Sequence, residues 1–80
     1  MDNEYFNLTA RELFAKNLRI SRRLRNISQI DLASQARMSD SYLNDIERGV
    51  ANVSIDEMEL LAESLGMDLV NLLSPEKMFN

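Results

Sequence analysis

Hydrophobic side chains recur every three or four residues along most of the chain, which is the spacing of amphipathic α-helices. Five stretches follow this spacing, and each begins at a Ser, Thr or Asp, residue types that cap helix N-termini. The predicted helices span residues 9–25, 28–36, 39–48, 54–65 and 68–73. No stretch alternates polar and apolar residues as a half-buried strand does. The pattern therefore predicts an all-α fold, with one domain at 9–74 between tails at 1–8 and 75–80.

The first predicted helix has an apolar side and a basic side. Thr9 and Glu12 form the Thr-x-x-Glu pattern of a capping box, and Asn26 tolerates the left-handed conformation that ends many helices. The apolar side consists of Leu13, Phe14, Leu18, Ile20 and Leu24. The basic side consists of Lys16, Arg19 and Arg23. Asn17 and Ser21 fall inside the apolar stripe. Ser21 occupies a position that suits a large hydrophobic side chain better, so we expect weaker packing there.

The second and third predicted helices are separated only by Arg37 and Met38, which fits a helix-turn-helix. Ser28 and Ser39 stand at their N-caps. The third helix has an inner side formed by Tyr42, Leu43 and Ile46. Its outer side is polar and consists of Asp40, Ser41, Asn44, Asp45 and Arg48. A helix that reads base edges in the major groove needs short polar groups of this kind.

The last two predicted helices differ in their apolar content. The fourth begins with a Ser54–Glu57 capping box and ends at Gly66, with inward residues Ile55, Met58, Leu61, Ala62 and Leu65 and an acidic, solvated outer side. The fifth begins at Asp68 and has more apolar surface than a terminal helix of so small a domain is expected to bury. We therefore expect a homodimer interface at Leu69, Val70, Leu72 and Leu73. Four tail residues either extend it or are disordered: Tyr5, Phe6, Met78 and Phe79.

Several motifs occur in the order typical of Cro/lambda-repressor-like (XRE-type) helix-turn-helix regulators. They are ISQIDLA at residues 27–33, YLNDIERG at 42–49 and LLAESLG at 60–66. Residues 11–73 therefore resemble this family, whose compact five-helix lambda-repressor-like DNA-binding domain is the fold we expect. The segments IERG at 46–49 and NVSI at 52–55 are similar to controller proteins of restriction-modification operons, a similarity that many phage regulators share.

The resemblance implies a sequence-specific transcriptional regulator that binds double-stranded DNA as a homodimer on a palindromic operator. The implied DNA-binding residues are Gln29, Arg37, Ser39, Asp40, Ser41, Tyr42, Asn44, Asp45, Arg48 and Asn52. Among these, Gln29, Arg48 and Asn52 would contact phosphates, whereas the outer side of the third helix would contact bases. Helix capping alone also explains Ser39. The resemblance further implies a partly buried structural ion pair between Arg22 and Glu47.

The net charge of −4 is unevenly distributed. Residues 11–37 contain seven basic and two acidic side chains, whereas residues 38–80 contain two basic and nine acidic ones. Two of the expected base-facing residues are aspartates, and Val50 and Ala51 stand where relatives are frequently basic. We therefore expect a weak electrostatic contribution to DNA affinity. The alternative hypothesis is a helix-turn-helix module that binds a regulatory protein and does not bind DNA itself.

Composition narrows the function further. The chain has no Cys and no His, and it lacks a glycine-rich phosphate loop and a nucleophile–base pair, so we expect neither an enzyme nor a bound cofactor or metal. The absence of Cys is compatible with a reducing cytoplasm, which is the location we expect. No apolar run approaches the roughly 20 residues of a membrane span, so we expect no membrane insertion.

Overall fold

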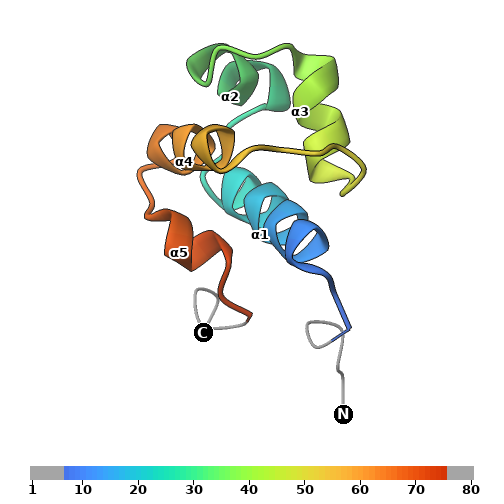
Figure 1. Ribbon diagram of the computed structural model, residues 1–80. Helices are drawn as coiled ribbons and strands as arrows, with labels where there is room; N and C mark the ends of the chain where they lie inside the picture. The colour runs from blue at the N-terminus through green and yellow to red at the C-terminus, as the bar shows by residue number, and fades with distance from the viewer. Residues whose placement is uncertain (1–6, 76–80) are drawn as a thin grey trace.

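The computed structural model describes residues 7–75, and within them all regular structure is α-helical. The helices are α1 (Ala10–Leu24), α2 (Gln29–Gln35), α3 (Asp40–Glu47), α4 (Ile55–Ser64) and α5 (Leu69–Leu72). In Figure 1, α2 and α3 lie together at one end, α1 crosses the middle of the domain, and α5 lies at the opposite end below α4. The all-α, five-helix prediction is confirmed.

Four of the five predicted N-caps are confirmed by side-chain hydrogen bonds. The hydroxyls of Thr9 and Ser54 each accept from a backbone amide three residues later, and a glutamate at that position accepts from the cap amide in return. Ser28 and Ser39 accept from the amides of Asp31 and Tyr42 at 3.0 and 3.1 Å. Asp68 makes no such bond, so α5 begins without a side-chain cap.

Each of the first four helices is followed, directly after its C-cap residue, by a residue in the left-handed region. Asn26 has a φ of 56°, as predicted, and Gly49 and Gly66 have φ values of 77° and 70°. The turn between α2 and α3 uses Arg37, with a φ of 59°, where a β-carbon costs about 1–2 kcal/mol relative to glycine. The backbone amide of Met38 then donates to the carbonyl of Ala33 at 3.0 Å, which closes the end of α2.

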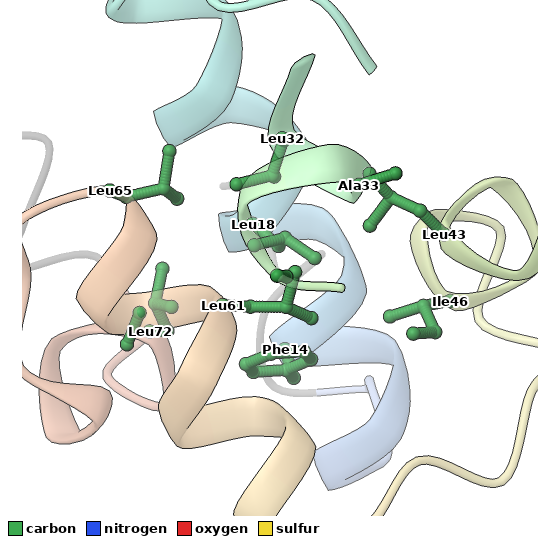
Figure 2. Packing of buried hydrophobic residues seen from close by; sticks show 11 residues of the cluster. Phe14, Leu18, Leu32, Ala33, Leu43, Ile46, Leu61, Leu65 and Leu72 are labelled. Carbon is green, nitrogen blue, oxygen red and sulfur yellow. The ribbon is translucent and has the colours of Figure 1, made fainter. Parts of the chain in front are cut away.

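The core lies between α1 and the other four helices. Figure 2 shows Phe14 and Leu18 of α1 facing Leu61 of α4, with side chains of α2, α3 and α5 around them. The buried apolar set is Phe14, Ala15, Leu18, Leu32, Ala33, Ala36, Leu43, Ile46, Leu61, Ala62, Leu65 and Leu72. This set comes from every helix, so the five short helices share one core.

Two residues expected on inner sides are exposed instead. Leu24 is 68% exposed at the last position of α1. Ile55 is 67% exposed at the first position of α4. The buried side of α1 includes Asn17, Ser21 and Arg22 in addition to its apolar residues.

Asn17 connects α1 to the end of α5. Its side chain is fully buried, and its Nδ2 donates to the carbonyl oxygens of Leu72 and Ser74 at 3.0 and 3.1 Å. The amide nitrogen therefore fixes two carbonyls at the end of the last helix. Ser21 is also fully buried, and within residues 7–75 neither its Oγ nor Oδ1 of Asn17 has a hydrogen-bond partner.

The structure corrects the predicted dimer interface. Leu72 is fully buried in the core of its own chain, so its assignment to the interface is wrong. Val70 is 66% exposed, and Leu69 and Leu73 are half-buried. Successive helical residues point about 100° apart, so Val70 and Leu72 cannot face the same side. Tyr5, Phe6, Met78 and Phe79 lie outside the described residues.

Within residues 7–75, no helix combines the length and the apolar content that crossing a bilayer requires. The same residues contain no group of three or more His, Cys, Asp or Glu side chains that could hold a metal ion.

Candidate nucleic-acid interface

The outer side of α3 carries short polar side chains on a helix whose inner side is fixed in the core. Leu43 and Ile46 are buried, which orients the helix. Asp40, Ser41 and Asn44 are exposed, and Asp45 is half-buried. The exposed set offers carboxylate, hydroxyl and amide groups, which are the groups that pair with base edges.

Tyr42 does not belong to this outer side. The hydrophobic pattern assigns it to the inner side, whereas the expected DNA-binding set includes it, and the structure agrees with the pattern. Its hydroxyl donates to Oε1 of Glu57 on α4 at 2.8 Å, and its ring packs against the core. The hydrogen bond to Glu57 raises the pKa of Tyr42. The pKa of Glu57 is lowered, first by the backbone amide of Ser54 and then by Tyr42.

Gln29, at the first position of α2, reaches across the turn to α3. Its Nε2 donates to Oε1 of Glu47 at 3.1 Å and to Oδ1 of Asn44 at 3.3 Å. The structure thus gives Gln29 an intramolecular role that its predicted phosphate contact did not include. It connects the two helices and holds the amide of Asn44 at the outer side of α3.

The predicted ion pair between Arg22 and Glu47 is confirmed. Nε and Nη2 of Arg22 donate to the two carboxylate oxygens at 2.7 and 3.0 Å, and Nη1 donates to the carbonyl of Ile27 at 2.9 Å. Arg22 is 9% exposed and Glu47 is 4% exposed. The hydrogen bond that Arg22 donates to Glu47 raises the pKa of Arg22, so this guanidinium stays charged. α1, α2 and α3 therefore meet at one carboxylate.

The remaining expected DNA contacts border the outer side of α3. Arg48 is exposed, and its Nη1 lies 3.6 Å from Oδ1 of Asp45. Asn52 is exposed in the segment after α3, and its Oδ1 accepts from Nη2 of Arg11 at 3.3 Å. The sequence contained no signal for the Arg11 contact, because it joins residues 41 positions apart. Arg37 is exposed in the turn before α3.

This arrangement defines an all-α helix-turn-helix protein with the lambda-repressor-like fold. The helix-turn-helix family model matches residues 18–72, and the chain belongs to this family of DNA-binding transcriptional regulators. The matched residues 18–72 include Arg22 and Glu47, the turn between α2 and α3, and the whole outer side of α3.

Among curated proteins, the chain is similar to the control protein C.BamHI of Bacillus amyloliquefaciens, with 42% identity over 48 residues covering 60% of this chain and 59% of that protein. It is also similar to the control protein C.SmaI of Serratia marcescens, with 30% identity over 70 residues covering 88% and 83%. The immunity repressor protein of Bacillus phage phi105 is 34% identical over 61 residues. The chain spans only 42% of that repressor, and 59% of C.BamHI.

Solved structures share the fold. The restriction-modification controller protein C.AhdI from Aeromonas hydrophila superposes with a TM-score of 0.74 at 33% identity, covering 76% of this chain and 92% of that chain. The hypothetical transcription factor NHTF from Neisseria gives 0.81 at 30% identity, covering 88% and 80%. Hydroxypropylphosphonic acid epoxidase from S. wedmorenis gives 0.77 at 24% identity, but 36% of that chain is covered, so this likeness shows the fold alone.

Proposed function

We propose that this protein is a sequence-specific regulator of transcription that binds double-stranded DNA as a homodimer on a palindromic operator. The observation that carries the proposal is the outer side of α3, where Asp40, Ser41 and Asn44 are exposed on a helix held by core contacts. The match to helix-turn-helix regulators over residues 18–72 supports the same function.

The base contacts follow from the side chains on α3. An amide such as that of Asn44 pairs with the N6 and N7 atoms of adenine, and a carboxylate accepts from the N4 amine of cytosine. Asp40 and Asp45 therefore favour cytosine at two positions of each half-site. Ser41, as a hydroxyl, donates or accepts and adds less discrimination.

The proposed dimer uses the exposed side of α5. Val70 is 66% exposed and Leu69 and Leu73 are half-buried, so a second copy would remove apolar surface from water. A two-fold axis there would present two copies of α3 to successive major grooves, about 34 Å apart. The two-fold symmetry of such a dimer is the reason for a palindromic operator, and the spacing of the two helices sets the separation of its half-sites.

A narrower proposal follows from the names of the relatives. C.BamHI and C.SmaI are control proteins, and C.AhdI is a restriction-modification controller protein. We infer a similar controlling role for this chain, as a regulator and not as an enzyme. The fold shared with an epoxidase does not alter this inference, because the fold alone does not specify chemistry.

The second candidate is a module that binds a regulatory protein. Two exposed or half-exposed carboxylates on α3 favour it, because they oppose the negative charge of DNA. Selection from a random pool of duplex DNA at low salt separates the two candidates. Enrichment of a two-fold symmetric sequence supports the regulator, whereas enrichment of no sequence refutes it and leaves the protein-binding module.

A double variant then tests the reading of bases. Asp40→Asn with Asp45→Asn removes two charges from α3 while keeping side-chain size, so it should lose roughly 1–3 kcal/mol of discrimination per contact at the enriched sequence while binding to unrelated DNA strengthens. Glu59→Gln with Glu63→Gln removes two exposed charges from α4 and is the matched control. Equal discrimination by both variants would show that the aspartates do not contact bases.

A further inference from the structure

A groove runs beside the outer side of α3 and is lined mainly by arginines. Its volume is about 320 Å³, and its walls are formed by Arg19, Arg22, Arg23, Gln29, Asn44, Glu47 and Arg48. A second hollow of about 240 Å³ shares Arg19, Glu47 and Arg48 with it and continues toward the start of α1. Both hollows are lined by residues of α1 and α3, and these helices contact each other, so the hollows lie at the junction of the two helices.

The charges in this groove do not balance. The carboxylate of Glu47 is already paired with Arg22 through two hydrogen bonds, so these two groups cancel. Neither the Arg19 nor the Arg23 side chain has a hydrogen bond or ion pair with any residue in the described range 7–75. Within the same range, the side chain of Arg48 has only the 3.6 Å contact with Asp45, and both of these side chains are at least half exposed. An exposed pair of this kind is weak and exchanges partners readily.

Three guanidinium groups thus border one concave surface. Two nearby carboxylates in the described range lie outside the buried pair: Asp45, 3.6 Å from Arg48, and Glu12, which lines the second hollow and accepts from the amide of Thr9. Like charges held together repel each other, and an anionic ligand removes that repulsion. Guanidinium groups bind phosphate oxygens with two parallel hydrogen bonds. The chemistry of the groove therefore fits phosphate groups along a backbone.

The position of the groove beside α3 indicates that these phosphates belong to the DNA that α3 contacts. Gln29 and Asn44 form part of its wall, and Asn44 also lies on the outer side of α3. A helix in the major groove of DNA has a sugar–phosphate strand on each side. A strand that passes along the α1 side of α3 would enter this groove.

We propose that Arg19, Arg23 and Arg48 form a phosphate-binding strip that holds the DNA backbone beside the α3 contact. This inference rests on the proposed DNA-binding function and adds α1 to its binding surface. It also revises the expected weak electrostatic contribution, because the cations missing at Val50 and Ala51 are supplied by α1. The strip positions the protein on DNA and reads no bases.

The test compares Arg23, near the end of α1, with Arg25, the residue that caps the end of this helix. Arg23→Gln removes a cation from the strip, whereas Arg25→Gln removes one outside it, where Arg25 donates to the carbonyls of Leu65 and Ser21. Binding of the dimer to the operator selected by the wild-type protein is measured from about 50 to 200 mM salt, the range in which phosphate contacts change affinity most. Melting temperatures of both variants check that each folds.

Arg23→Gln should reduce the steepness of the log–log salt dependence by about 0.9 per phosphate contact, or about 1.8 per dimer, and Arg19→Gln should do the same. Arg25→Gln should leave it unchanged, and all variants should select the wild-type sequence. A wild-type slope in Arg19→Gln and Arg23→Gln would overturn the strip while leaving DNA binding intact. A changed sequence preference would overturn it as a purely backbone contact. Failure of the wild-type protein to select any DNA would remove the proposed function and the strip together.

Discussion

Arg22 of α1 and Glu47 of α3 join their helices through two parallel hydrogen bonds of 2.7 and 3.0 Å. The same carboxylate accepts from Gln29 at the start of α2. Glu47 therefore holds the helix-turn-helix against α1 and is itself almost inaccessible to solvent. This glutamate joins three helices from inside the domain, while Asp40, Ser41 and Asn44 of the same helix remain exposed to solvent.

Removal of one partner of this pair should be strongly destabilising. Arg22→Ala leaves the Glu47 carboxylate buried without its cation, so the free energy of unfolding should fall by about 3–5 kcal/mol. The double variant Arg22→Met with Glu47→Leu leaves no unpaired charge and should lose less. Urea denaturation of both measures the difference. If the double variant were as unstable as the single one, the loss of an unpaired buried charge could not explain the destabilisation, and the attraction within the pair would itself contribute to the free energy of unfolding.

Asn17 and Ser21 occupy the same buried side of α1 but should respond differently to alanine. Asn17→Ala leaves the carbonyls of Leu72 and Ser74 without a donor and should cost about 1–3 kcal/mol. Ser21→Ala removes a hydroxyl that has no hydrogen-bond partner within residues 7–75, so it should be neutral or stabilising. Thermal unfolding compares the two. A marked destabilisation by Ser21→Ala would show that its hydroxyl has a partner in solution, such as a bound water.

Substitutions of Val70 and Leu72 should affect different properties, dimer association and folding stability, although both residues lie in α5. Val70→Glu places a charge on exposed surface, so it should dissociate the dimer and leave the monomer folded. Leu72→Ala opens a cavity in the core and should cost about 2–5 kcal/mol of stability. Sedimentation at micromolar concentration and denaturation measure the two effects. A wild-type monomer at that concentration would contradict the proposed interface.

The contact between Tyr42 and Glu57 should make stability depend on pH. The pKa of Glu57 is lowered in the folded protein, so its stabilising effect is present above its unfolded value of about 4.5 and is lost as the pH falls through the folded pKa. Tyr42→Phe weakens this effect, by less than about 1 kcal/mol because both side chains are only half-buried. The difference in unfolding free energy between wild type and variant should therefore be larger at pH 7 than at pH 3. A difference independent of pH would exclude this carboxylate as its origin.

Local interactions were predictable from the sequence because they join residues only a few positions apart. The capping bonds of Thr9, Ser28, Ser39 and Ser54 each span three residues. The left-handed end at Asn26 likewise depends on the preceding helix turn. The pair of Arg22 and Glu47 was predictable for a different reason, since a family resemblance supplies a contact that spacing alone does not.

The sequence by itself thus determined where the helices begin and end, and which side of α3 faces outward, because periodicity and capping act within a few turns. Only the tertiary structure decided that Leu72 faces the core while Val70 faces solvent, because a four-residue helix is too short for its periodicity to define a buried side. It also decided that Asn17 bonds a carbonyl 55 positions away. Such contacts depend on how helices pack, which brings together groups that have no spacing rule in the sequence.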